Sequence, residues 1–295
     1  MSITIEETPV LADFPAPPGG DPGTGPKRPG RPSRVSRTLV MAGGLAWAVV
    51  GFAGVVAMWQ ALNATVPGFP SPGDGYRELV RLLSNPFYDN GPNDKGIGRQ
   101  VFVSLQRVLG GFTMAALVGV PVGLAIGTSR RAWQAVNPVM QILRPVSPLA
   151  WFPLWLVVFK DTGKAAVFVI FITALWPIVI NTAAGAAGVP QDHRNVARVF
   201  CFGRLAYLRH VLLPNTAPSI VTGLRLSMGI AWMVIVAAEM LSGGSGIGFF
   251  VWDSYNADNL PAVVAAIVLI GAVGLALDAA FLRLSRRVTL QEVAP

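Results

Sequence analysis

Long apolar runs constrain this chain more than any other feature of its sequence. Six such runs cover residues 39–62, 101–127, 138–159, 165–184, 217–241 and 261–282. About 20 apolar residues in a helix suffice to cross the hydrocarbon core of a bilayer. The sequence therefore predicts an all-α integral membrane protein with six transmembrane helices.

The composition argues against a soluble globular domain. Hydrophobic residues make up 53% of the chain and charged residues 13%, whereas soluble domains carry about 25% charged residues. So few charges cannot solvate a folded surface. The net charge of +8 is then better explained by basic cytoplasmic loops than by a nucleic-acid partner.

The third run is the least regular of the six. It contains Pro145, Pro148 and Pro153, and only residues 160–164 separate it from the fourth run. Proline removes a backbone hydrogen bond and bends a helix, which a membrane protein tolerates where neighbouring helices satisfy the backbone. We therefore expect kinked or broken helices here.

Basic residues indicate the orientation, because Lys and Arg accumulate in cytoplasmic loops. They gather in the N-terminal tail and in the loop between the fourth and fifth runs, at Lys27, Arg28, Arg31, Arg34, Arg37, Arg194, Arg198, Arg204 and Arg209. Both segments lie on the same side of the membrane if the N terminus is inside. We expect both termini to be cytoplasmic.

This topology divides the chain into five segments. Residues 1–37 form a basic cytoplasmic tail without the apolar region of a signal peptide, and it is too polar to offset its ordering entropy, which predicts disorder. Residues 38–62 form the first transmembrane helix, and residues 63–98 an extracytoplasmic loop. Residues 99–287 form a core of five helices, and residues 288–295 a cytoplasmic tail.

Two segments outside the spans carry patterns of their own. The basic tail either binds acidic phospholipid or only holds the N terminus in the cytoplasm. Within the outer loop, Tyr76, Leu79, Val80 and Leu83 share one helical face. Residues 76–84 are therefore predicted to form an amphipathic helix on the outer surface.

Arg107, Arg144 and Arg225 lie inside apolar runs, each about seven residues from an end, or roughly 10 Å at a rise of about 1.5 Å per residue. Such side chains can extend to an interface or line a polar cavity. Glu239 and Asp278 lie near the ends of their runs. No ionisable residue is expected at the bilayer midplane, which argues against a proton relay or a voltage sensor.

The sequence shows no catalytic, nucleotide or metal motif. Residues 163–164 are a Gly-Lys pair, but alanine follows and the spacing of a P-loop is missing. Cys201 is the one cysteine, and His193 and His210 are not spaced as a zinc motif. Such a membrane protein is a channel, a secondary carrier, a scaffold or one part of a larger complex.

The loop of residues 185–215 is too long and too regular for a plain connector. Pro190 followed by Asp192 is typical of a helix start. Val196, Val199 and Phe200 share one helical face, and Gly203 interrupts the pattern. A short helix of this kind can lie on the membrane or dock in a groove of a cytosolic partner, and physics alone leaves both open.

This loop resembles the cytoplasmic EAA motif of ABC importer permeases, E-A-A-x-x-x-G followed by nine residues and I-x-L-P. Asn195, Val196 and Ala197 take the E-A-A place, and Cys201 takes the place of the glycine. The first acid and the glycine are therefore replaced. The resemblance implies an ATPase-coupling helix within residues 190–214. Its contact residues would be Asn195, Val196, Ala197, Arg198, Val199, Phe200, Cys201, Gly203, Leu213 and Pro214.

The resemblance extends over residues 99–287, through segments such as SLQRVLGGF, ILRPVSPLAWFPLWLVVF and GLRLSMGIAWMVIVAAEML. These look like the nitrate, sulfonate, taurine and bicarbonate branch of the type I permeases. Nitrate permeases are the most similar, and bicarbonate and cyanate permeases nearly as similar.

The resemblance implies a methionine-importer-like core and a place in the cell inner membrane. The chain would import a small inorganic anion, most of all nitrate or nitrite, with bicarbonate, cyanate, sulfonate or taurine as alternatives. Two permease copies, two cytosolic ATPases and an extracytoplasmic solute-binding protein would assemble. The partners would use ATP, and this chain would bind no cofactor. A carrier or channel that works alone is the alternative of a different class.

An anion pathway needs hydrogen-bond donors inside the spans. The candidates are Trp176, Thr173, Asn181, Ser227 and Trp232, with packing as the alternative role. Donors at broken helix ends can serve the same purpose.

Small residues recur every fourth position at Gly111, Ala115, Gly119, Gly123 and Gly127, which predicts close helix packing, within the chain or between two copies.

The glycine-rich residues 242–248 predict a tight turn before a re-entrant or interfacial stretch. Its polar and aromatic residues, Trp252, Asp253, Tyr255 and Asn256, would face the outer mouth and either contact the binding protein or serve the structure.

Overall fold

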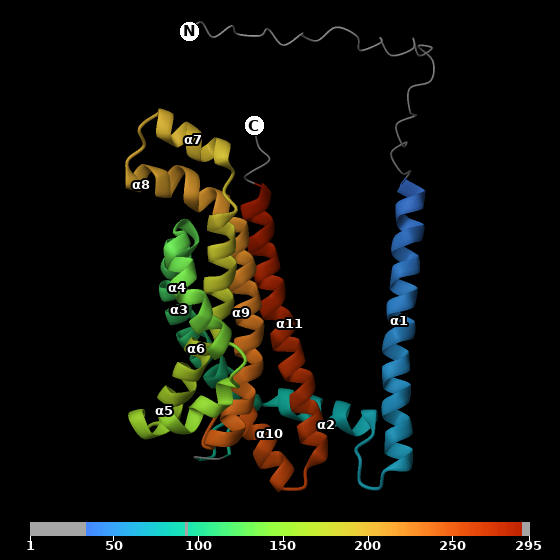
Figure 1. The fold of residues 1–295 in the computed structure, drawn as a ribbon. Helices are drawn as coiled ribbons and strands as arrows, with labels where there is room; N and C mark the ends of the chain where they lie inside the picture. The colour runs from blue at the N-terminus through green and yellow to red at the C-terminus, as the bar shows by residue number, and fades with distance from the viewer. Residues whose placement is uncertain (1–33, 92–93, 291–295) are drawn as a thin grey trace, which may run out of the picture. The chain divides into compact units, whose positions relative to one another are not determined.

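A computed structural model of the chain describes residues 34–91 and 94–290 (Figure 1). These residues form helices and turns, with no β-strand in either range. Contacts divide the chain into residues 1–58 and residues 59–295. Helix α1 (Arg34–Thr65) begins within the predicted tail, of which residues 1–33 lie outside the described ranges. Likewise, α11 (Leu260–Leu290) includes the start of the predicted C-terminal tail.

Five described stretches are long and apolar enough to cross a membrane. They are Ala46–Thr65 in α1, α3 (Ile97–Thr128), α6 (Thr162–Ala187), Arg204–Ser242, which ends in α9 (Leu213–Ser242), and Leu260–Ser285 in α11. These stretches confirm the first, second, fourth, fifth and sixth predicted runs.

The third run is not one continuous span. It is divided among α4 (Arg130–Leu143), η1 (Pro148–Trp151) and α5 (Phe152–Phe159), and the two halves are bent by 88°. The break falls where Pro145 and Pro148 lack amide hydrogens and disfavour helical geometry in the residue before them. The expected break is therefore confirmed. Only if the bent pair counts as one span does the described chain reach six.

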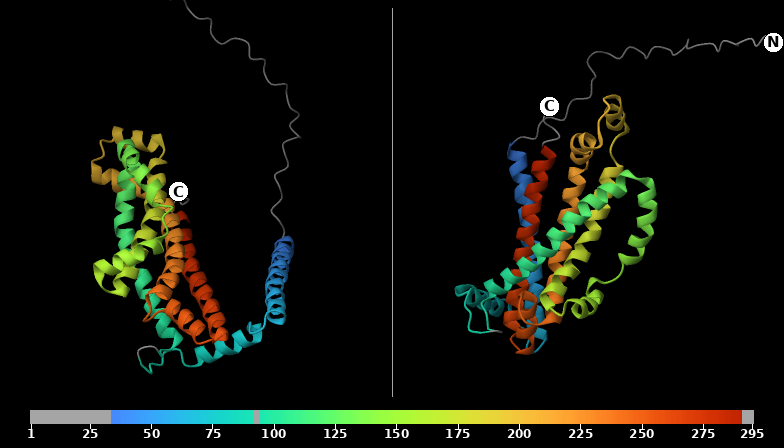
Figure 2. Two further views of the ribbon diagram at one scale, coloured as in Figure 1. Left: turned by 60° about the horizontal axis from the view of Figure 1, so that its bottom comes forward. Right: turned by 90° about the vertical axis from the view of Figure 1, so that its left-hand side faces the viewer.

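Helix α6 is the centre of the core, packed against α3 on one side and α9 on another, with α11 against α9 (Figure 1). At one end of this core lie α7 (Gln191–Val199) and α8 (Arg204–Tyr207), and at the other lie α2 (Pro72–Ser84), α5 and α10 (Ile247–Asn256) (Figure 2). The bundle thus separates two groups of short helices.

The glycine stripe of α3 packs on α6 within the same chain. A Cβ at Gly123 would lie 2.6 Å from the Cβ of Thr182, and one at Gly127 would lie 2.3 Å from the Ala183 carbonyl oxygen. Gly111 and Gly119 approach α6 equally closely. Intramolecular packing, rather than a dimer face, therefore explains the four-residue spacing.

The predicted amphipathic helix is α2, which begins one turn earlier than expected. Ser71 caps it, and the Ser71 hydrogen bonds, with Arg77 nearby, hold the pKa of Asp74 below its usual value. Leu82 is buried and Leu79 packs on the core. The other apolar residues of the predicted face, Tyr76, Val80 and Leu83, are exposed, as in a helix at a membrane surface.

We predict that Gly123→Ala destabilises the protein, because the added methyl group meets the Thr182 Cβ and the Val179 carbonyl oxygen at distances below 3 Å. Overpacking of this kind costs about 1–3 kcal/mol. Thermal unfolding of the purified protein in detergent measures the effect.

Gly110→Ala on the same helix is the matched control, since its nearest neighbour would be Val167 Cγ1 at 3.9 Å. Equal unfolding temperatures for the two variants would contradict the tight α3–α6 contact.

Candidate functional site

A helical hairpin between α6 and α9 forms one candidate site. Pro190 precedes the first residue of α7, and Asp192 lies in its first turn, as the sequence predicted. After α8, the π-helical turn η2 (Leu208–Leu212) leads directly into α9. Ala197 is buried with Val189, Val211 and Leu212. This small apolar cluster holds the hairpin on the end of the bundle.

Cys201 has a positive φ of 50° at the end of α7. The Phe202 amide donates to the Ala197 carbonyl at 2.9 Å, and the Cys201 amide to the Arg198 carbonyl at 3.0 Å. This is a Schellman motif, in which the left-handed position usually holds glycine. The residue aligned with the glycine of the EAA motif therefore adopts a glycine-like conformation although it is a cysteine.

The outer side of the hairpin is apolar and uncovered. Val199 is 79% exposed, Phe200 70% and Leu205 76%, with Val196 and Phe202 also exposed. Of the other predicted coupling residues, Asn195, Arg198, Gly203 and Pro214 are exposed and Leu213 is half-buried. A group of exposed large apolar side chains of this kind marks an interaction site.

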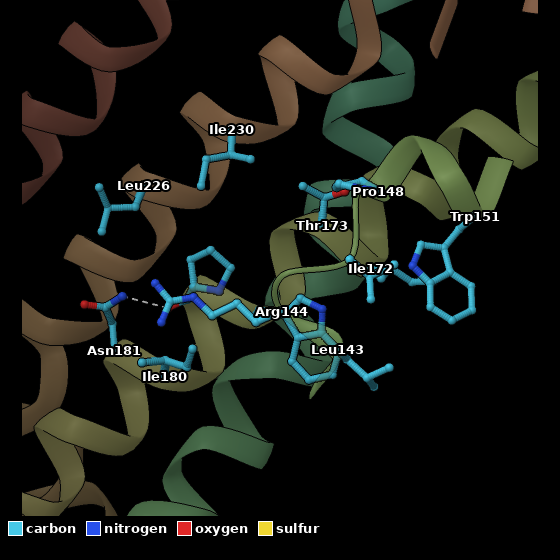
Figure 3. Close-up of a pocket in the computed structure, with 13 residues that line it drawn as sticks. Leu143, Arg144, Pro148, Trp151, Ile172, Thr173, Ile180, Asn181, Leu226 and Ile230 are labelled. Atoms are coloured by element: carbon cyan, nitrogen blue, oxygen red, sulfur yellow. Dashed lines mark hydrogen bonds between the residues drawn. The ribbon is translucent and has the colours of Figure 1, made fainter. Parts of the chain in front are cut away.

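The second candidate site is a pocket of about 400 Å³ where the broken segment meets α6 and α9 (Figure 3). Three of the predicted pathway residues, Thr173, Trp176 and Asn181, line it. Thr173 Oγ1 donates to the Val169 carbonyl at 2.7 Å, so its hydrogen is already engaged. Asn181 Nδ2 donates to the Pro177 carbonyl at 2.8 Å and keeps a second hydrogen. The indole N–H of Trp176 has no hydrogen-bond partner among the described residues.

Ser227 and Trp232, the other two predicted pathway residues, lie outside this pocket. Ser227 is fully buried, and its hydroxyl donates to the Ala174 carbonyl at 2.8 Å. The Trp232 indole donates to the Ile270 carbonyl at 3.0 Å. The Ser227 hydroxyl therefore connects α9 to α6, and the Trp232 indole connects α9 to α11.

Arg144 also lines the pocket, at the break that follows α4. Figure 3 shows its side chain extending from the break towards Asn181. The sequence had left open whether this arginine reaches an interface or lines a cavity. In the sequence, Arg144 lies next to two prolines in an apolar run, and this pattern indicates a break near the arginine. The 88° bend that brings the segment to α6 is seen only in the structure.

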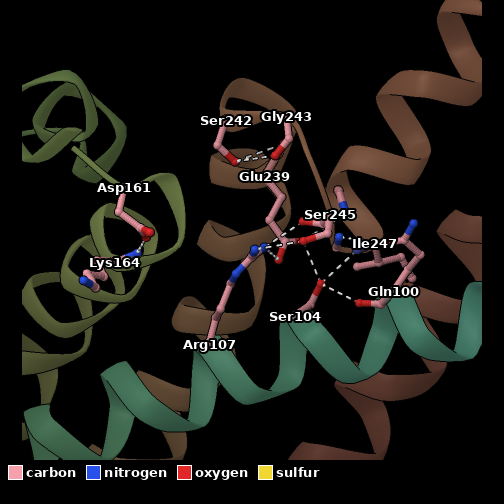
Figure 4. Close-up of polar contacts among 12 residues, drawn as sticks. Gln100, Ser104, Arg107, Asp161, Lys164, Glu239, Ser242, Gly243, Ser245 and Ile247 are labelled. Carbon is pink, nitrogen blue, oxygen red and sulfur yellow. Dashed lines mark hydrogen bonds and ion pairs between the residues drawn. The ribbon is translucent and has the colours of Figure 1, made fainter. Parts of the chain in front are cut away.

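A buried ion pair connects α3 and α9 at the opposite end from the hairpin (Figure 4). Glu239 is fully buried, and its carboxylate accepts from Arg107 at 2.8 Å, from Ser104 at 2.6 Å and from the Gly248 amide at 3.1 Å. These donors satisfy an ionised carboxylate away from water. The sequence showed both charges but not that they meet.

The same network fixes the glycine-rich turn before α10. Arg107 donates to the Ser245 carbonyl at 2.7 Å, and the Gly246 amide donates to Gln100 at 2.7 Å. Gly246 has a φ of 117°, and a Cβ there would lie 2.1 Å from the Glu239 carboxyl carbon. The turn therefore requires glycine for both conformation and space.

Arg225 and Asp278 form a second ion pair, between α9 and α11, with two hydrogen bonds of 2.6 and 2.8 Å. Its planar, two-point geometry is the strong form of a carboxylate–guanidinium contact. In the described ranges, no group of three or more His, Cys, Asp or Glu side chains could hold a metal ion.

The fold and the hairpin define a permease subunit. Residues 119–290 match the family model described as "Binding-protein-dependent transport system inner membrane component". The chain belongs to this family, the type I ABC permeases, as the sequence resemblance predicted. Members of such transport systems work with separate ATPase and binding-protein subunits.

Individual relatives are similar over most of their length. The nitrate import permease protein NrtB of Synechocystis sp. is 47% identical over 230 residues, 78% of this chain and 84% of that protein. The bicarbonate transport system permease protein CmpB of Synechococcus elongatus is 42% identical over 252 residues, 84% of this chain and 91% of that protein.

Solved structures support the fold. An inward-facing conformation of the MetNI methionine ABC transporter has a TM-score of 0.59 at 19% identity, covering 65% of this chain and 95% of that chain. The predicted methionine-importer-like core is thereby confirmed.

We predict that Glu239→Gln strongly destabilises the protein, because Arg107 then lacks its counter-charge in a buried site. Removing one partner of a buried ion pair costs about 3–5 kcal/mol. Thermal unfolding in detergent, or the yield of folded protein in the membrane, measures the loss.

Asp253→Asn is the control, since it neutralises an exposed carboxylate on the neighbouring α10. A stability of Glu239→Gln equal to that of this control would refute a structural role for the buried pair.

Proposed function

We propose that this chain is the membrane-spanning subunit of an ATP-driven importer for a small inorganic oxyanion, most of all nitrate or nitrite. The assignment of the substrate rests on the 47% identity to a nitrate import permease over 78% of the chain. Bicarbonate is the second candidate, favoured by the 42% identity to bicarbonate permeases over 84% of the chain.

The uncovered hairpin supports the coupling role. Val199, Phe200 and Leu205 are too exposed to stabilise this chain alone, and an apolar helix face of this kind fits a groove on a cytosolic partner. We assign that groove to an ATPase subunit. ATP is then bound and hydrolysed by the partner, and this chain acts as a transport subunit without a cofactor or an enzymatic activity of its own.

This assignment sets the orientation and the assembly. The hairpin end of the bundle would face the cytoplasm. We propose that both termini are cytoplasmic as well, on the distribution of basic residues. Two permease copies then provide the pathway and dock two ATPases. A homodimer is the simplest arrangement, and a second, different permease the alternative.

The opposite end would receive substrate from a solute-binding protein. On α10, the exposed rings of Trp252 and Tyr255 stack with centroids 5.8 Å apart, beside exposed Asp253 and Asn256. Aromatic residues with a polar surround are typical of protein interfaces. We propose this face as a contact for the binding protein.

Reconstitution in liposomes tests the function. The permease with its ATPase and binding protein should take up labelled nitrate only when ATP is supplied, and excess bicarbonate should not compete. Uptake by the permease alone would establish a secondary carrier or channel instead. ATP-driven uptake of bicarbonate but not nitrate would assign the second substrate.

We predict that Phe200→Asp and Val199→Asp each abolish co-purification of the ATPase, because an unpaired charge in a desolvated contact costs several kcal/mol, about 3 or more. Uptake should fall in parallel. The amount of permease in the membrane should not change, since these side chains are exposed outside the spans.

Arg198→Ala serves as the milder comparison, because charges at an interface rim mainly alter association rate and salt dependence. Normal co-purification with Phe200→Asp would mean that the hairpin lies on the membrane and binds no ATPase.

A further inference from the structure

Three arginines, Arg107, Arg144 and Arg225, lie inside the apolar runs predicted from the sequence, and the structure pairs two of them. Arg107 bonds to Glu239 at 2.8 Å, and Arg225 bonds to Asp278 at 2.6 Å. The backbone amide of Arg144 donates to the Met140 carbonyl at 2.9 Å, but its side chain has neither an ion pair nor a hydrogen bond among the described residues. It is also the one ionisable side chain of those that line the 400 Å³ pocket.

An unpaired guanidinium inside a bilayer is costly. Charged side chains inside a bilayer pair with one another, face a water-filled cavity or reach an interface. No carboxylate of the described chain lines the pocket, so a counter-charge there would be an anion from outside the chain.

The other donors in the pocket suit an anion. The indole N–H groups of Trp151 and Trp176 have no partner among the described residues, and Asn181 keeps one amide hydrogen. Apolar residues from α9, Leu226 and Ile230, form the opposite wall. Each water occupies about 30 Å³ in the liquid, so a pocket of 400 Å³ accommodates a small oxyanion together with several waters.

We infer that Arg144 is the counter-charge that binds the transported oxyanion within the membrane, with Trp151, Trp176 and Asn181 as further donors. This inference rests on the proposed import of nitrate or a similar anion. A planar guanidinium presents two parallel N–H groups, which match two oxygens of a planar oxyanion such as nitrate or bicarbonate. The pocket is thus a subsite of the pathway rather than a packing defect.

The first test measures transport by the complete importer with Arg144→Gln and Arg144→Lys. For nitrate uptake by the glutamine variant, kcat/KM should fall about ten- to a hundredfold, the range for a lost hydrogen bond to a charged group. The kcat/KM of the lysine variant should lie between those of the unchanged protein and the glutamine variant, because lysine keeps the charge but lacks the planar pair of N–H groups. Arg131→Gln, the same change at an exposed position of α4, should transport normally.

Co-purification of the ATPase and the basal ATP hydrolysis of each variant show whether the importer is assembled. If Arg144→Gln assembles and transports normally, the inference is overturned. If the glutamine variant fails to assemble, Arg144→Lys decides, because a purely electrostatic anchor to lipid phosphate would leave lysine with full transport.

The second test observes the site without transport. Cys201 is the sole cysteine, so Cys201→Ser provides a background in which Ile172→Cys places a thiol in the pocket. Nitrate should slow the labelling of this thiol by a water-soluble thiol reagent about threefold or more, as expected when most of the sites are occupied. The protection should vanish with Arg144→Gln and persist with Arg131→Gln.

The two tests separate the failure of this inference from the failure of the proposed function. Protection by bicarbonate but not by nitrate, lost with Arg144→Gln, would retain the Arg144 site while changing the substrate. Normal nitrate uptake with no protection by either anion would leave the importer intact and overturn the site, as expected if Arg144 faces lipid headgroups.

Discussion

Ion pairs join the helices of this bundle, because a charged side chain within a membrane has to pair, face water or reach an interface. The Arg107–Glu239 pair joins α3 to α9, and its remaining hydrogen bonds hold the turn that starts α10. The Arg225–Asp278 pair joins α9 to α11. A single unpaired charge inside a membrane is costly. These ion pairs therefore determine which helix faces meet, and they do so with more specificity than apolar contacts alone would provide.

Close backbone approach provides the second constraint. The glycines of α3 add no side chains of their own at the contact with α6, and a Cβ at Gly119 would lie within 2.9 Å of the Ile178 side chain. In lipid, such dispersion contacts replace the hydrophobic effect as the force between helices. The proline-rich segment beside this pair bends by 88°, and the pocket lined by Arg144 lies at the bend.

The hairpin shows why a degenerate motif can keep its structure. The glycine of the motif is absent, but Cys201 adopts the left-handed conformation with both hydrogen bonds of a Schellman motif. Those bonds offset a conformational cost of about 1–2 kcal/mol for a non-glycine residue. The cap turns the chain so that Phe202 and Leu205 extend the apolar surface begun by Val199 and Phe200.

The sequence by itself determined the membrane spans, the glycine seam and the position of the hairpin, because these follow from local periodicity. It could not determine that Arg107 meets Glu239, 132 positions later, nor that Ser227 and Trp232 use their donors between helices while Arg144 enters the pocket with Trp176. Those outcomes depend on the rotation and bending of whole helices. Only the tertiary structure decides them, since the same local pattern permits several partners.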